Sequence, residues 1–174
     1  MAANIDLLIQ KMCDKQEEEA YVYADQLAEI GGEEVLQKLV DVLKGDDIES
    51  GYLAARALSA MEDNQAALEP LLEVIHDKNN KMKNGTFVQA LEGFDLSSKF
   101  VDILRLYLFG NFKASFIAKD YLDYTEFDIT PRTIKKAEKH WNHFQNNSKH
   151  DESFDIKKEE VESILNDLKS MFEE

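Results

Sequence analysis

The sequence has 174 residues, 44% of them apolar, which is enough for a domain with a buried core and excludes a chain that is disordered throughout. Its net charge is −15, from 20 basic and 35 acidic residues, and this charge repels a phosphate backbone, so no nucleic-acid partner is expected. Cys13 is the only cysteine, which excludes an intramolecular disulfide and a thiolate-rich metal site.

Hydropathy argues against a membrane partner. No apolar run approaches the roughly 18 residues that a membrane-spanning helix needs. Residues 1–14 lack the basic segment followed by an apolar segment that marks a secretory signal. A cytoplasmic location is therefore the expectation, in line with the scarcity of cysteine.

The acidic residues are concentrated in the first half of the chain. Residues 1–80 hold 18 acidic and 6 basic residues, residues 81–126 hold six of each, and residues 127–174 hold 11 and 8. Two interpretations stay open at this point. The charge forms an acidic docking face, or it only keeps the surface solvated.

Three segments of the chain resemble one another: 20–43, 51–75 and 85–108. Leu27, Leu58 and Leu91 occupy equivalent positions, at offsets of 31 and 33 residues. A second set of equivalent positions lies three residues further on and contains Ile30, Met61 and Phe94. A fourth, weaker copy begins at Ser115 and has Tyr121 and Tyr124 at these two positions. A period of this length is typical of stacked helical repeats.

Each copy reads as two helices joined by a short turn. Apolar residues recur at steps of three and four, as in Leu36, Leu39 and Leu43, which is the period of a helix with one buried face. Gly31 and Gly32 can adopt the left-handed backbone that ends a helix. For the second helix of the third copy, Ser97 or Ser98 is the expected N-cap. No alternation of period two is present, so the prediction is an all-α fold without a sheet.

The string from Gln26 to Asp46 resembles the HEAT-repeat consensus of the phycobilin-lyase-like subgroup, and the string from Ala57 to Ile75 resembles it again, with Pro70 early in the second helix. Gly32 replaces the aspartate of the consensus turn in the first copy, and Ser59 and Glu62 replace glycines in the second. The resemblance implies a short right-handed α-α superhelix, a solenoid of three to four HEAT-like helical hairpins, over residues 1–126.

The C-terminal helices, in residues 127–174, are expected to continue and cap the same domain. Thr130 as N-cap and Pro131 at the first helical position predict a helix over 132–145. A polar linker of about 146–154 follows, and Asp155 is expected to cap a last amphipathic helix. Because solenoid ends expose apolar surface, this helix is interpreted as the C-terminal cap and residues 5–9 as the N-terminal one. The alternative is that the last helix docks a partner.

No pattern in the sequence indicates catalysis, a cofactor or a metal. His140 and His143 are three residues apart, which is a weak metal motif. The preferred interpretation is a polar helix face with Trp141 and Phe144 packed inward. Among HEAT-like enzymes, the iron-dependent deoxyhypusine hydroxylases use His-Glu dipeptides, which this sequence lacks. The acidic runs lack the spacing and the central glycine of a calcium loop.

The resemblance implies that the second helices of the repeats line a concave face, where equivalent residues form ladders. We therefore predict a partner-binding surface on these helices, made of Gln37, Asp41, Glu69, Glu73, His76, Asp102 and Arg105. An acidic surface of this kind suits a basic segment of a partner protein and would steer its encounter. The predicted function is a non-catalytic protein-protein interaction module.

Two alternatives come from other functional classes. The first is an immunity or inhibitor-type protein that blocks a basic toxin or nuclease, which the small size and the acidity permit. The second is a lyase-like enzyme of the phycobilin-lyase group. The identity of the partner and the oligomeric state stay open.

Overall fold

The computed structural model describes residues 4–173, and these residues form ten α-helices and three short 3-10 segments without a strand. The prediction of an all-α fold is confirmed for this part of the chain. The chain divides into two compact units, which meet between Asp95 and Leu96. Each unit is described by itself. This boundary places the first helix of the third repeat copy in unit 1 and its second helix in unit 2. The predicted division at 126/127, between a repeat array and the helices that continue the same domain, stays a prediction.

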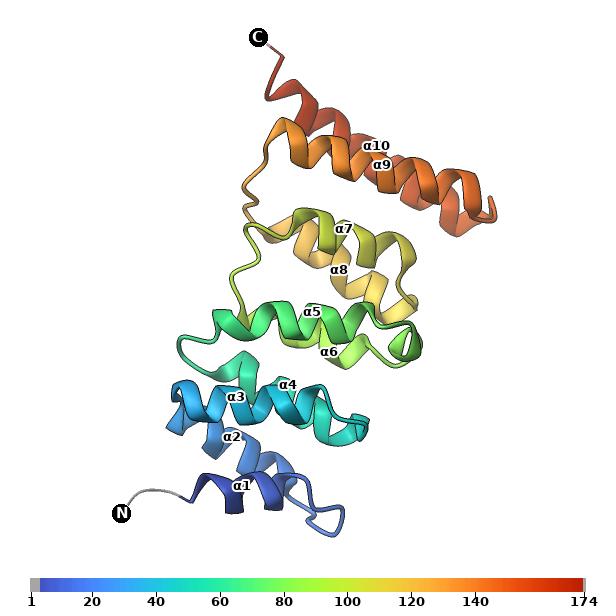
Figure 1. Cartoon of the computed structure of the whole chain (residues 1–174). Helices are drawn as coiled ribbons and strands as arrows, with labels where there is room; N and C mark the ends of the chain where they lie inside the picture. Colours follow the sequence, from blue (N-terminus) through green and yellow to red (C-terminus); the bar gives the residue numbers. More distant parts are fainter. Residues whose placement is uncertain (1–3, 174) are drawn as a thin grey trace. The chain divides into compact units, whose positions relative to one another are not determined.

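Unit 1 consists of short antiparallel helices in two rows (Figure 1). The helix α4 packs against α2 on one side and α6 on the other, while α3 packs against α5. The first helix, α1, packs against α2, in the position expected of an N-terminal cap. The elements are α1 (Ile5–Met12), α2 (Ala20–Ile30), α3 (Gly32–Leu43), α4 (Ile48–Ala60), η1 (Gln65–Ala67), α5 (Leu68–His76), η2 (Lys78–Asn80), α6 (Gly85–Ala90) and η3 (Leu91–Gly93).

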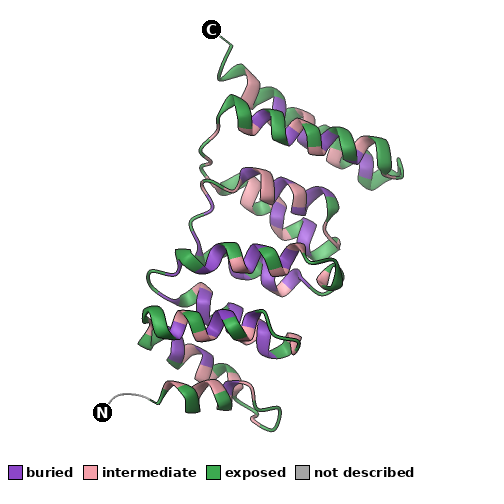
Figure 2. Cartoon of the chain, in the orientation of Figure 1, coloured by how far each residue is buried: buried purple, intermediate pink, exposed green. Residues whose placement is uncertain are grey.

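The equivalent leucines of the repeat form the core of unit 1. Leu27, Leu58 and Leu91 are all completely buried, as the repeat alignment predicted. The purple stripes of Figure 2 follow the facing sides of these helices. The second set of positions behaves less uniformly, because Met61 is buried whereas Ile30 is 41% exposed. Ile30 has no preceding full hairpin to cover it, so it stays at the margin of the array.

Small residues let the first helices approach one another closely. Four alanines are completely buried, and their methyl side chains are small enough for neighbouring helices to pack closely. They are Ala24 in α2 and Ala54, Ala55 and Ala57 in α4. The closest approach is at Gly93, where an added Cβ would stand 2.0 Å from the carbonyl oxygen of Ser59. No real Cβ makes such a contact, so this position requires glycine.

Unit 2 consists of four helices, of which the last two are longer than any helix of unit 1: α7 (Phe100–Phe109), α8 (Phe112–Tyr124), α9 (Pro131–Asn147) and α10 (Glu152–Ser170). The helix α7 packs against α8 and α9, and α10 packs against α9. In Figure 1, α8 and α10 lie behind α7 and α9. The fourth repeat copy corresponds to α8. Its Tyr124 is 86% exposed, so this copy forms a helix but does not bury all the positions that the other copies bury.

Aromatic rings fill the core of unit 2. Trp141 and Phe144 are buried, as predicted, and both stack on Phe154 of α10, with centroid distances of 6.2 and 5.8 Å. Phe109 of α7 meets Phe144 edge-on at 5.6 Å. Ring contacts of this kind add stabilisation beyond the burial of area. The last helix is thereby fixed to α9 as part of the core of unit 2.

Two predicted helix starts are wrong and one is right. Thr130 caps α9, and its Oγ1 accepts from the amide of Thr133, with Pro131 first in the helix as predicted. The last helix begins earlier than expected, because the carboxylate of Asp151, not of Asp155, accepts from the amide of Phe154. The predicted linker is therefore mostly helical, and its loop is confined to 148–151.

The other wrong start concerns α7. Its N-cap position is Lys99, not Ser97 or Ser98, and the cap has no side-chain hydrogen bond. Instead, the carbonyl of Ser97 accepts from the amide of Asp128, which ties the start of α7 to the segment before α9 within unit 2. A long-range backbone contact thus replaces the local cap that the sequence suggested.

Candidate partner-binding groove

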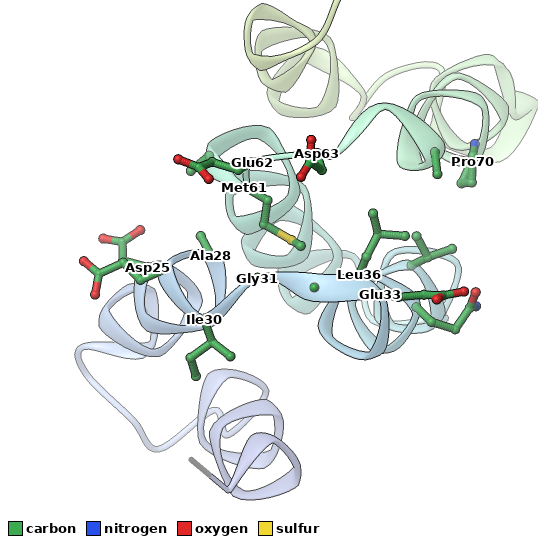
Figure 3. Close-up of a pocket in the computed structure, with 16 residues that line it drawn as sticks. Asp25, Ala28, Ile30, Gly31, Glu33, Leu36, Met61, Glu62, Asp63 and Pro70 are labelled. Atoms are coloured by element: carbon green, nitrogen blue, oxygen red, sulfur yellow. The ribbon is translucent and has the colours of Figure 1, made fainter. Parts of the chain in front are cut away.

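A hollow of unit 1 lies where the turns between paired helices come together. It is formed by the ends of α2 and α4, the start of α3 and the segment leading into α5, and its volume is about 1100 Å³ (Figure 3). The residues that line it are Asp25, Ala28, Glu29, Ile30, Gly31, Gly32, Glu33, Leu36, Gln37, Val40, Ala60, Met61, Glu62, Asp63, Ala66 and Pro70. We call this hollow the acidic groove.

The acidic groove has a charged margin and an apolar floor. Five carboxylates line it, and no lysine, arginine or histidine is among the lining residues. They are Asp25, Glu29, Glu33, Glu62 and Asp63. The floor includes Ala28, Val40 and Met61, which belong to the core of the unit. This combination favours a ligand that is positively charged at its edges and apolar in the middle.

Only one of the five carboxylates has a cationic partner. Asp25 accepts two hydrogen bonds from the guanidinium of Arg56, at 2.8 and 2.9 Å, and these bonds hold the pKa of that carboxyl below its usual value. Within residues 4–173, the other four carboxylates of the groove form no ion pair. Their charge is therefore available to an incoming cation.

The turns that carry these carboxylates are held by unusual backbone and by one buried amide. Gly31 and Gly32 have positive φ angles of 61° and 85°, as expected of this glycine turn, while the ψ of −161° at Gly31 differs from that of a left-handed helical cap. Asp63 also has a positive φ, 51°, a conformation that aspartate tolerates better than most residues. Beside it, the buried Asn64 donates from Nδ2 to the carbonyls of Leu58 and Gly93, at 2.8 and 3.0 Å.

Two of the residues predicted to bind a partner lie on α3. Gln37 lines the acidic groove and donates from Nε2 to Asp41 at 3.1 Å, one turn further along the helix. Asp41 is exposed but does not line the groove. Of the seven predicted residues, Gln37 alone is part of the groove lining.

Three further predicted residues, Glu69, Glu73 and His76, lie on α5. Glu73 forms an ion pair of 3.1 Å with Lys44 at the end of α3, so much of its charge is already balanced. Glu69 is exposed and His76 is half-buried at the last position of the helix. The neighbouring Pro70, not Glu69, reaches the groove.

The last two predicted residues, Asp102 and Arg105, lie on α7 in unit 2. They face each other one turn apart, with 3.8 Å between the guanidinium and the carboxylate. The predicted ladder therefore includes residues of both units. Within unit 1, four carboxylates without an ion pair line the acidic groove, whereas Glu73 on the second helix α5 is paired with Lys44.

Sequence reasoning missed four carboxylates of the groove: Asp25, Glu29, Glu62 and Asp63. Glu29, Glu62 and Asp63 lie at the end of a first helix or in the turn after it, and Asp25 lies in the middle of α2. A turn between paired helices was treated only as a connection. Glu33, in the first turn of α3, is the fifth carboxylate of the groove.

The histidines and acidic residues do not form a metal site within residues 4–173. In the part of the chain from 4 to 173, no group of three or more histidine, cysteine, aspartate or glutamate side chains is arranged to hold a metal ion. His143 contacts the ring of Phe109 at a centroid distance of 6.0 Å, and His140 is half-buried. No helix in the same residues has the length and apolar character of a membrane span.

Comparison with known proteins identifies one family. The model of the family described as HEAT repeats matches residues 5–92, which is half of the chain and includes the whole acidic groove. No match was found among curated proteins or among solved structures.

Proposed function

Because the chain belongs to the HEAT-repeat family, we propose that it is a protein-binding module that holds a basic segment of a partner in the acidic groove. HEAT repeats are generally scaffolds for protein-protein interaction, and stacked repeats offer extended surfaces for it. The observation that carries the proposal is the groove lining, with four unpaired carboxylates around an apolar floor.

The geometry suggests what kind of segment would fit. Glu29 and Glu62 are exposed and come from equivalent ends of two neighbouring repeats, so basic side chains on one segment can meet both. Met61, Leu36 and Ala66 offer apolar contact between them. A short segment with lysine or arginine flanking an apolar residue satisfies both requirements. The carboxylates would then govern the rate of encounter and its salt dependence.

The proposal makes the chain non-catalytic, with no resident cofactor. The likeness to the phycobilin-lyase-like subgroup remains a sequence prediction, because the matching family model is the general one. The inhibitor alternative is a special case of the same proposal, in which the basic partner is a toxin or nuclease and loses its activity on binding.

Charge reversal tests the groove. We expect the double variant Glu29→Lys, Glu62→Lys to lose a partner that the native chain retains in affinity capture from lysate, with a basic binding region in that partner. The matched control is Glu18→Lys, Glu19→Lys, which changes the net charge equally at exposed positions outside the groove. The variant Glu69→Lys, Glu73→Lys tests the surface predicted on α5.

Three outcomes are distinguishable. Loss of the partner only in the groove variant supports the proposal. Loss of the partner only in the Glu69→Lys, Glu73→Lys variant contradicts the acidic groove and indicates that the partner binds the surface predicted on α5. Equal retention by all variants, or equal loss from all of them, contradicts a specific role of the acidic groove.

A further inference from the structure

Unit 2 contains a second groove of different chemistry, between α8 and α10. Its volume is about 760 Å³, within the range of roughly 300–1,000 Å³ that small-molecule sites occupy. Its floor comes from α7 and its walls from the two other helices. It is lined by Tyr107, Gly110, Phe112, Ser115, Phe116, Lys119, Glu152, Ser153, Ile156, Lys157 and Glu160. We call it the aromatic groove.

Large apolar side chains form its walls and are exposed to water. Phe112 and Phe116 of α8 are 89% and 65% exposed, and their rings stack with centroids 6.4 Å apart. Ile156 of α10 is 54% exposed and lines the same groove. In unit 1 the corresponding first helices meet through buried alanines. In unit 2, the large side chains of Phe112, Phe116 and Ile156 take the place of such alanines. Exposed apolar side chains that gather in one groove are typical of a binding surface.

A lysine in the groove supplies a cation in a partly buried setting. The ammonium of Lys157 donates to the carbonyl oxygen of Leu108 at 3.2 Å and lies 5.5 Å from the ring centroids of Tyr107 and Phe144. Within residues 4–173, no carboxylate forms an ion pair with it. Burial lowers the pKa of Lys157, because its charge has lost part of its hydration.

The acidic side chains of the groove do not balance this cation. Glu160 accepts a hydrogen bond from the hydroxyl of Tyr107 and lies 3.9 Å from the ammonium of Lys119. Burial, followed by this hydrogen bond to Glu160, raises the pKa of Tyr107, so the hydroxyl remains a donor. Glu152 is exposed in the first turn of α10. The ammonium of Lys157 thus has room for one more acceptor.

We propose that the aromatic groove binds a small carboxylate with an aliphatic tail. The carboxylate pairs with the ammonium of Lys157, and the tail lies between Phe116 and Ile156 and against Phe112. A charged partner at Lys157 replaces hydration that burial has removed, and the tail covers the exposed rings. The site is independent of the acidic groove, which belongs to unit 1.

Displacement of a fluorescent probe tests this site. We expect 1-anilinonaphthalene-8-sulfonate to bind with enhanced, blue-shifted emission and dodecanoate, below its micelle concentration, to displace it. Dodecanol has the same tail without the charge, and we expect it to compete about tenfold less well, the factor lost with one charge-assisted hydrogen bond. The variant Lys157→Met should weaken dodecanoate by about the same factor, and Lys157→Arg should restore it.

Two wall variants locate the probe. Phe116→Glu and Ile156→Asp should each abolish the emission, whereas Met82→Glu, at an exposed methionine of unit 1, should leave it unchanged. All three positions are exposed, so circular dichroism should report native helix content. The proposal is overturned if dodecanoate fails to displace the probe, if dodecanol competes equally, or if Lys157→Met binds dodecanoate as the native chain does. Probe binding at the walls without displacement would indicate an apolar protein segment as the occupant.

Discussion

The two units use the same paired-helix plan with different side chains at the seams. In unit 1, buried alanines and a required glycine bring the first helices into direct contact. In unit 2, stacked rings of α9 and α10 form the core, and exposed phenylalanines line a groove on α8. Unit 1 holds 20 acidic and 8 basic residues, whereas unit 2 holds 15 and 12.

The comparison teaches how side-chain size at a seam determines which surface is left for binding. Where the side chains between neighbouring helices are small, the helices pack in direct contact, and the remaining hollow lies at the turns, where polar residues are common. Where these side chains are large, the helices stay further apart and leave an apolar groove between them. The acidic groove and the aromatic groove are therefore consequences of packing, and each suits a different class of ligand.

Core truncation should have the largest effect and tests whether the two cores are built as described. Phe154→Ala removes a ring that stacks on Trp141 and Phe144, and we expect a loss of about 3–5 kcal/mol in the free energy of unfolding. Leu58→Ala removes a completely buried repeat leucine, and about 2–5 kcal/mol is expected.

Hydrogen exchange followed by peptide separates the two variants. Amides of α9 and α10 should lose protection in Phe154→Ala, and amides of α2 and α4 in Leu58→Ala. Loss of protection in the wrong unit would contradict the assignment of these side chains to separate cores. Ile30→Ala serves as a control, because that side chain is 41% exposed and its loss should cost far less.

Glycine substitution tests the close seam of unit 1. Gly93→Ala would place a Cβ 2.0 Å from the carbonyl oxygen of Ser59, and we expect a loss of about 1–3 kcal/mol as the helices are forced apart. Gly51→Ala in α4 is the matched control. Its Cβ would meet Phe87 at an ordinary 3.4 Å, and the gain in helix propensity offsets the adjustment. Chemical denaturation measures both, and equal stabilities would disprove the close approach.

The smallest expected effect concerns the ion pair beside the acidic groove. The pKa of Asp25 is lowered, so the pair stabilises the fold above the ordinary value of 3.8, and this contribution disappears as the pH falls through the lowered pKa. Because both side chains are about half exposed, we expect only about 0.5–1 kcal/mol at neutral pH.

A double-mutant cycle of Asp25→Asn and Arg56→Met, measured by denaturation, isolates this coupling energy. It should be present at pH 7 and absent near pH 2. A coupling energy that does not change over this range would show that the interaction does not depend on the ionised carboxylate.

Much of the fold could be predicted because the buried positions of helical repeats recur at a regular spacing in the sequence. Leu27, Leu58 and Leu91 are spaced by the repeat, and Thr130 with Pro131 signals a helix start through local chemistry alone. The two wrong starts have different causes: α10 is capped locally by Asp151 instead of Asp155, whereas the start of α7 depends on a long-range contact. The segment before α9 bonds to the carbonyl of Ser97, and sequence spacing contains no record of such a contact.

The candidate site was harder to predict. The HEAT-like pattern indicated which helices are second in each pair, but not where the charge of those helices is already balanced. Glu73 appeared available in the sequence and is paired with Lys44. The aromatic groove was not predicted at all, because Phe112, Phe116 and Ile156 look like core residues by composition. Only their exposure in the folded chain distinguishes them.

One consequence follows from where two unique residues lie. Cys13, the only cysteine, sits at the end of α1 in unit 1 and is partly exposed, while Trp141, the only tryptophan, lies in the ring stack of unit 2. A thiol-reactive dye and intrinsic indole emission therefore give the native chain two spectroscopic reporters, one for each unit. Two melting curves recorded on a single labelled sample would reveal whether the halves of the molecule unfold together or in turn.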